Sequence, residues 1–183
     1  MEWSDAVLNC ADRIQPDVIF IPEYAPEIRR NMFTNSKWDL LRHSPCPVTI
    51  VRPDSRSQRK VILAALNIRT ENQKYIELNE KILKQAKRVA SLYHAELYVI
   101  NSYKDSMHSP DREQLLKFTG LDTEYVHLEE GDPADVISRY ADEINADMVV
   151  IGTMHRTGAA ALMRGNTSEK VLRKVKQDVL TLS

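Results

Sequence analysis

Short apolar runs alternate with amphipathic stretches along most of the chain. Apolar runs of strand length predict strands buried on both faces, and apolar residues at helical spacing predict the helices between them. From residue 60 onward, the predicted strands are Val61–Leu66, Glu96–Ile100, Thr123–Leu128, Met148–Ile151 and Val179–Leu182. This alternation predicts an α/β fold, with a parallel sheet, helices on both of its faces and right-handed crossovers.

Capping residues mark the ends of the predicted helices. A long helix is expected at about Gln73–His94, and a second one at Asp111–Thr119 is closed by Gly120. Asp132 followed by Pro133 is a strong helix start, because aspartate caps a helix and proline suits its first position.

The loop Ile151–Thr167 leaves a predicted buried strand and ends at a helix start. Ligands of parallel sheets bind at the carboxyl ends of the strands, which places Asn67 and Gly152 near one another if their strands are neighbours. Free backbone N–H groups at a helix start suit a phosphate, so the loop is a candidate anion-binding loop. Alternatively, Asn166 is only an N-cap and Glu169 closes a capping box, because side-chain oxygens satisfy the same N–H groups.

The first 53 residues repeat part of this pattern. Asp17–Ile21 aligns with Asp147–Ile151 at an offset of 130, and the helix residues before each strand match at the same offset. Pro22 stands in place of Gly152, so we expect no close approach of a phosphate to the backbone there. The expected organisation is a degenerate C-terminal half domain at 1–53, a polar linker at 54–59 and a complete domain at 60–183.

The last strands of the two copies also correspond. Val48 aligns with Val179 after a one-residue gap. We therefore expect Val48–Val51 to pair with Val179–Leu182 across a pseudo-two-fold axis, in a homodimer or a pseudo-dimer.

Composition narrows the function classes. Lys and Arg number 25 against 26 Asp and Glu, so no general field attracts nucleic acid or an anionic membrane. No apolar run approaches the ~18 residues that span a bilayer, and the N-terminus lacks the pattern of a signal peptide. Cys10 and Cys46 form no CxxC pattern, which fits a reducing compartment. A cytoplasmic protein is expected.

No catalytic or metal-binding motif stands out. The five histidines show no ligand spacing with one another or with cysteine, so no metal site is predicted. Neither a Gly-x-Ser-x-Gly elbow nor a Walker sequence occurs, which disfavours a dedicated enzyme. Asp132 is interpreted as a helix cap rather than a catalytic acid.

A combination of motifs resembles the universal stress protein family. These motifs are Asn67 after the first strand of the complete domain, Gly131-Asp132-Pro133, and Gly152-x2-His155-x9-Gly165-Asn166-Thr167. The tandem, E-type members look most similar, since they carry loops like Arg156-Thr157-Gly158 and Gly165-Asn166-Thr167. The resemblance implies an adenine nucleotide alpha hydrolase-like fold, an open doubly wound sheet of five parallel strands in the order 3-2-1-4-5.

The resemblance also implies a site for ATP or a related adenine nucleotide, with or without Mg²⁺. Carried over by position, the site residues are Gly152, His155, Gly165, Asn166 and Thr167 for the phosphates, Ala65, Asn67 and Ile151 for the base side, and Ser102 beside the second strand. Three positions depart from the family pattern. His155 replaces a glycine and either blocks the phosphate site or donates to it. Asn166 replaces Ser or Thr, and Asn67 replaces an acid.

Two hypotheses of different classes follow. The first is a regulatory module of universal stress type that binds an adenine nucleotide or similar anion and takes part in the stress response. The second is an interaction or dimerisation module with a degenerate pocket and no cofactor. Slow nucleotide hydrolysis is a third, outside hypothesis.

Overall fold

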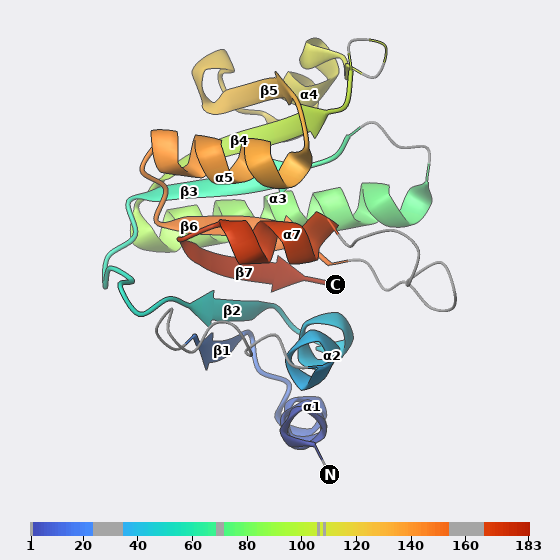
Figure 1. The fold of residues 1–183 in the computed structure, drawn as a ribbon, viewed down its shortest axis with the longest axis vertical. Helices are drawn as coiled ribbons and strands as arrows, with labels where there is room; N and C mark the ends of the chain where they lie inside the picture. Colours follow the sequence, from blue (N-terminus) through green and yellow to red (C-terminus); the bar gives the residue numbers. More distant parts are fainter. Residues whose placement is uncertain (1, 24–34, 69–71, 106, 108, 154–166) are drawn as a thin grey trace.

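The computed structural model describes residues 2–23, 35–68, 72–105, 107, 109–153 and 167–183. One seven-stranded mixed sheet runs through it in the order β1-β2-β7-β6-β3-β4-β5 (Figure 1). The strands are β1 (Ile19–Pro22), β2 (Val48–Val51), β3 (Val61–Leu66), β4 (Glu96–Tyr103), β5 (Val126–Glu130), β6 (Met148–Gly152) and β7 (Asp178–Leu182). The described helices are α1 (Trp3–Ile14), α2 (Asn35–His43), α3 (Gln73–Tyr93), α4 (Arg112–Thr119), the short 3-10 helix η3 (Thr123–Tyr125), α5 (Pro133–Glu143) and α7 (Thr167–Lys174).

The predicted α/β fold class is confirmed, with one difference in the sheet. Strands β5-β4-β3-β6-β7 are mutually parallel, and their order corresponds to the predicted 3-2-1-4-5. The sheet is nevertheless not an open one of five strands, because β2 adds to the outer edge of β7 and β1 adds to β2.

The predicted pairing of the two last strands is confirmed within this single chain. β2 and β7 are antiparallel, with Val48 opposite Thr181 and Ile50 opposite Val179. The hydroxyl of Thr181 also donates to the carbonyl oxygen of Val48 at 3.1 Å. Both edges of β2 and both edges of β7 are occupied by strands of the same chain, so this arrangement is intramolecular.

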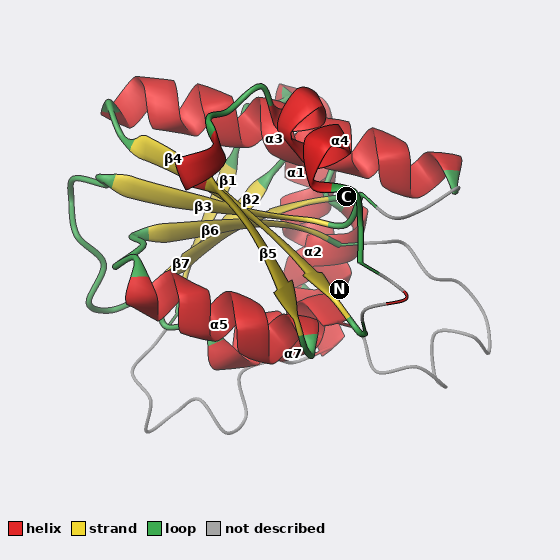
Figure 2. Ribbon diagram, turned by 90° about the horizontal axis from the view of Figure 1, so that it is seen from above, coloured by secondary structure: helices red, strands yellow, loops and turns green. Residues whose placement is uncertain are grey.

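Helices cover the two faces of the sheet. Figure 2 shows α3 and α4 on one side, and α5 and α7 on the other. The apolar stripe of α3 packs on the first face, where Ile82 and Ala86 are buried, and Ile137 and Leu172 are buried on the second. Each large apolar side chain removed from water in this way contributes about 1.5–3 kcal/mol.

The capping residues in the sequence correctly predicted the start of α5 and the end of α4. The side chain of Asp132 accepts a hydrogen bond from the backbone N–H of Ala134 at 3.0 Å, with Pro133 in the first turn of α5. Gly120 ends α4 with a φ of 64°, a left-handed conformation that glycine adopts without strain.

Two predicted strand limits were wrong by three residues. Thr123–Tyr125 forms a 3-10 turn, closed by a hydrogen bond from the backbone N–H of Tyr125 to the carbonyl oxygen of Asp122, so β5 begins only at Val126. β4 continues past Ile100 to Tyr103, because β5 pairs with its last residues.

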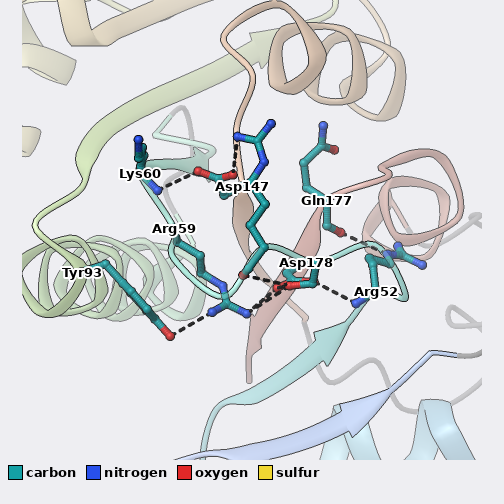
Figure 3. A network of polar contacts seen from close by, with 9 residues as sticks. Arg52, Arg59, Lys60, Tyr93, Asp147, Gln177 and Asp178 are labelled. Atoms are coloured by element: carbon teal, nitrogen blue, oxygen red, sulfur yellow. Dashed lines mark hydrogen bonds and ion pairs between the residues drawn. The ribbon is translucent and has the colours of Figure 1, made fainter.

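The predicted linker is held against the amino ends of the central strands. The buried carboxylate of Asp178 accepts hydrogen bonds from the backbone N–H of Arg52 at 2.8 Å, the hydroxyl of Ser55 at 2.6 Å and the guanidinium of Arg59 at 2.5 Å (Figure 3). The carboxylate of Asp147 accepts from the backbone N–H of Lys60 at 2.7 Å. Two carboxylates of the complete domain thus fix both ends of this segment.

Arg52 joins the first 53 residues to α7. Its buried guanidinium donates to the carbonyl oxygens of Leu172 at 2.8 Å and Gln177 at 3.0 Å, at the C-terminal end of α7, and forms an ion pair with Glu23. Burial lowers the pKa of Arg52 to about 10, and the carboxylate of Asp178 opposes that shift. A cation suits the end of a helix, where carbonyl groups lack intrahelical partners.

Candidate functional site

A pocket of about 230 Å³ opens at the carboxyl ends of β3, β4 and β6. Its described lining is Ala65, Leu66, Asn67, Tyr75, Leu78, Asn79, Ile82, Ser102, Pro133, Ile137, Ile151, Gly152, Thr167, Ser168 and Val171. Parallel pairing of β3 with β4 and with β6 brings these strand ends to one edge of the sheet. This is the edge at which ligands of doubly wound folds bind.

Most of the predicted site residues come together here. Six of them line the pocket: Ala65, Asn67, Ser102, Ile151, Gly152 and Thr167. The remaining three, His155, Gly165 and Asn166, lie outside the described residues. Six positions that the family pattern names thus line one concavity, although they lie up to about 100 positions apart in the sequence.

Sequence reasoning missed the contribution of the helices. Tyr75, Leu78 and Ile82 of α3 and Ile137 of α5 all line the pocket. Ile82 and Ile137 lie at the helical spacing that is typical of core positions. Whether a buried helical residue also lines a pocket depends on where its helix crosses the sheet. The periodicity of apolar residues in the sequence does not show where that crossing lies.

Two buried asparagines hold the loop after β3. The side chain of Asn79 donates to the carbonyl oxygen of Asn67 at 2.7 Å and accepts from the backbone N–H of Asn67 at 3.1 Å. Asn101 accepts from the backbone N–H of Ile68 at 2.9 Å. This clamp fixes the backbone of Asn67, whose side chain is exposed at the pocket.

Gly152 is required by packing between α3 and β6. A Cβ atom at this position would lie 2.5 Å from Cδ2 of Leu78, 2.7 Å from Cγ of Leu78 and 3.0 Å from Cδ1 of Ile82. The sequence attributed this glycine to close approach of a phosphate. The close contact with α3 is sufficient reason for it, since a larger residue would force the side chain of Leu78 or the backbone to shift.

The residues beside Gly152 are tied to other elements. The hydroxyl of Ser168, in the first turn of α7, donates to the carbonyl oxygen of Gly152 at 2.7 Å. The buried hydroxyl of Thr153 lies within hydrogen-bonding distance of two carbonyl oxygens, that of Leu41 in α2 at 3.1 Å and that of Leu182 in β7 at 3.2 Å. The end of β6 is thus held from both sides.

Every residue of the described lining is uncharged. Thr167 and Ser168, at the start of α7, line the pocket, and the start of α5 is capped by Asp132, which also lies 3.9 Å from Lys170 at the surface. Within the described parts of the chain, no group of three or more His, Cys, Asp or Glu residues is placed to hold a metal ion. A search of the described helices also finds no candidate membrane span.

Comparisons with known sequences assign part of the chain to a family. Residues 102–183 match the sequence profile of the universal stress protein family. Universal stress protein E of Photorhabdus laumondii is 30% identical over 175 residues, which covers 82% of this chain and 56% of that protein. Its counterpart in Escherichia coli K12 is 29% identical over 174 residues, covering 82% and 55%. The chain therefore spans a little over half the length of these curated relatives.

Solved structures share the fold. A putative universal stress protein from Pseudomonas aeruginosa UCBPP-PA14 has a TM-score of 0.83 and 26% identity, covering 100% of this chain and 68% of that one. A functionally unknown protein from P. aeruginosa PAO1 has a TM-score of 0.84 and 27% identity, with the same coverage. A universal stress protein solved in complex with cAMP is more distant, with a TM-score of 0.51 and 18% identity over 69% of this chain and 98% of that one. Together these findings support the universal stress protein family for this chain, with a domain of that family at residues 102–183.

Proposed function

We propose that this chain is a regulatory module of universal stress type that binds an adenine nucleotide in the pocket at the carboxyl ends of β3, β4 and β6. The observation that carries this proposal is the convergence of Asn67, Ser102, Gly152 and Thr167 on one pocket with apolar walls. Apolar walls with a few placed polar groups are the usual construction of a small-molecule site.

The nucleoside part would occupy the described pocket, between α3 on one side and α5 and α7 on the other. The phosphates would extend toward Gly152 and Thr167. The family pattern also assigns phosphate contacts to His155, Gly165 and Asn166, which lie outside the described residues. With no carboxylate in the described lining, a Mg²⁺ ion would be held by the phosphates of the nucleotide rather than by the pocket.

The chain would act through ligand-dependent conformation or partner binding. The names of the E-type relatives suggest that it does so in the stress response. A distant universal stress protein was solved with cAMP, which makes adenine nucleotides the first ligands to test. On this proposal the first 53 residues are a half domain that joins the complete domain through β2 and β7. They form a pseudo-dimer within one chain.

Isothermal titration with ATP, AMP and cAMP, each with and without Mg²⁺, tests the proposal. We expect saturable heat and a melting temperature that rises with ligand concentration, since a ligand that binds only the native state stabilises it. Ser102→Trp should abolish binding by filling the pocket, and Ser109→Trp, an equal change at an exposed loop position outside the lining, should not. Absence of both heat and stabilisation at millimolar ATP would reject nucleotide binding and favour the interaction module.

His155→Gly resolves the role of the residue that departs from the family loop. If the imidazole obstructs the phosphate site, the variant binds ATP more tightly. If the imidazole donates to a phosphate, the variant binds ATP more weakly.

A further inference from the structure

We infer that β1 and α1 form a docking surface for a β-α-β unit of another polypeptide chain. The incoming strand would pair in parallel with the outer edge of β1, as β3 pairs with β6 in the complete domain. The inference goes beyond the proposed function and is independent of the nucleotide pocket. It rests on three comparisons between the half domain and the complete domain.

The first comparison concerns the edges of the strands. β1 ends the described sheet, whereas its counterpart in the repeat, β6, has a parallel partner on each edge. The backbone N–H of Ile19 donates to the carbonyl oxygen of Pro47 at 2.9 Å, on the side of β2. Alternation along the strand therefore directs the backbone N–H and C=O groups of Val18 and Phe20 away from β2, where no described strand pairs with them. An edge of this kind accepts a further strand.

The second comparison concerns the burial of apolar side chains. Phe20 is 59% exposed, whereas Val150, at the corresponding position of β6, is completely buried in the cluster that α3 covers. Ile14 is 65% exposed, whereas its counterpart Ile144 packs against the core. Of the five large hydrophobic side chains that the described residues expose, Trp3, Ile14 and Phe20 lie on α1 and β1. A gathering of this kind marks an interaction surface.

The third comparison indicates the direction of the incoming strand. The carboxylate of Asp147 accepts hydrogen bonds from the backbone N–H groups of Lys60 at 2.7 Å and Val61 at 3.0 Å, at the start of β3. Asp17 holds the corresponding place before β1. Its side chain is 83% exposed and lies 3.3 Å from Arg88 at the surface. Asp17 can therefore hold the first N–H groups of a strand that runs parallel to β1.

The position of α1 favours a β-α-β unit over a second copy of the chain. α1 packs on α2 and lies beyond β1 (Figure 1), as α5 packs on α7 and lies over β4. If two copies paired through antiparallel β1 strands, both α1 helices would lie on the same face, and each would need the place that α2 of the other copy holds. A β-α-β unit avoids this conflict, because its strand would lie under α1 and its helix would cover Phe20 from the other face, as α3 covers Val150.

The probe for this surface is a separate polypeptide of residues 60–131, because that segment contains β3, α3 and β4. The probe carries Leu78→Ala, since Leu78 approaches Gly152 in the complete domain and Pro22 stands in place of that glycine. Calorimetry with the full chain should show a one-to-one complex with a Kd below about 10 µM. Hydrogen exchange of the backbone amide of Phe20 should slow at least ~10-fold on saturation.

Variants of the full chain locate the contact. Phe20→Asp should weaken the complex at least ~100-fold, because it places an unpaired charge beneath the incoming helix. Met107→Asp, a comparable change at another exposed apolar position, is the matched control and should leave the Kd unchanged. Asp17→Ala should weaken the complex about 10-fold by removing the acceptor for the first N–H groups of the strand.

A fused form repeats the test at high effective concentration, with the same segment joined ahead of residue 1 by a flexible linker, and it decides the outcome where the free probe does not bind. If neither form slows exchange at Phe20, or if Phe20→Asp and Met107→Asp bind the probe equally, the inference is overturned. Dimerisation of the chain that Phe20→Asp abolishes would assign the surface to a second copy and overturn it as well. None of these results bears on the nucleotide pocket, so the proposed function is tested separately.

Discussion

At the amino ends of β6 and β7 the polar chemistry is charged and mostly hydrogen-bonded, with Nε of Arg59 left without a hydrogen-bond partner among the described residues. At the carboxyl ends of β3, β4 and β6 the polar side chains of the described lining are uncharged, and only some of them are hydrogen-bonded. Asp178 accepts hydrogen bonds from Arg52, Ser55 and Arg59 at the first end. Asn67 and Ser102 face a pocket without a described partner at the second. Buried charges that are paired suit a structural role, and neutral unpaired groups on apolar walls suit ligand binding.

The largest expected effect is at the charged end. Asp178→Ala leaves the guanidinium of Arg59 buried without its counter-charge, so we expect a loss of about 3–5 kcal/mol in the free energy of unfolding, measured with urea. Asp142→Ala is the matched control, since it removes an exposed pair with Lys176 and should cost less than about 1 kcal/mol. Equal losses in the two variants would show that the buried cluster is not a structural centre.

Thr153→Val tests the connection between the end of β6 and α2. The change keeps the shape of the side chain and removes a buried hydroxyl that lies close to the carbonyl oxygens of Leu41 and Leu182. We expect the free energy of unfolding to fall by about 1–3 kcal/mol, the usual cost of leaving buried polar groups unpaired. Thr153→Ser retains the hydroxyl and should recover most of the hydrogen-bonding contribution. A neutral result for Val would indicate that water satisfies those carbonyl groups.

The two hydrogen bonds between the side chain of Asn79 and the backbone of Asn67 should contribute to ligand binding in the pocket. We expect Asn79→Ala to weaken ATP about 10-fold by releasing the backbone of Asn67, a free-energy change near 1.4 kcal/mol. Because the two residues act together, the double variant with Asn67→Ala should be no weaker than the poorer single variant, which a double-mutant cycle measures. Additive effects of the two substitutions on the affinity for ATP would show that Asn79 does not act through Asn67.

The smallest effect concerns pH. The hydrogen bond from Lys176 lowers the pKa of Asp142, and partial burial opposes this shift. A carboxylate with a lowered folded-state pKa stabilises the native state above its unfolded value of about 4, and this contribution is lost as pH falls through the lowered value. The stability difference between the wild type and Asp142→Asn should therefore be below about 1 kcal/mol near pH 6 and shrink toward pH 3. A difference that grows on acidification would reverse the assigned sign.

The sequence predicted what depends on local patterns. Apolar runs located the strands, and Asp132 and Gly120 marked helix ends because capping is decided within a few residues. The resemblance to a family also named Asn67, Ser102 and Gly152 as site residues, and all three line one pocket.

What the sequence did not predict depends on contacts between distant elements. Gly152 is explained by the close approach of Leu78 from α3, which no local pattern records. Arg59 lies at the end of a polar stretch that looked like a linker, yet it is buried because Asp178, more than 100 residues away, provides the counter-charge.

The most direct test of the contrast between the two ends is a titration with AMP, followed by ¹⁵N–¹H chemical shifts of the backbone amides. The account predicts saturable shifts in the amides of residues 65–68, 101–103, 151–153 and 167–168, with the amides of residues 145–147 and 176–178 unchanged. Saturable shifts confined to the amino ends of β6 and β7, or none at either end at millimolar AMP, would contradict it.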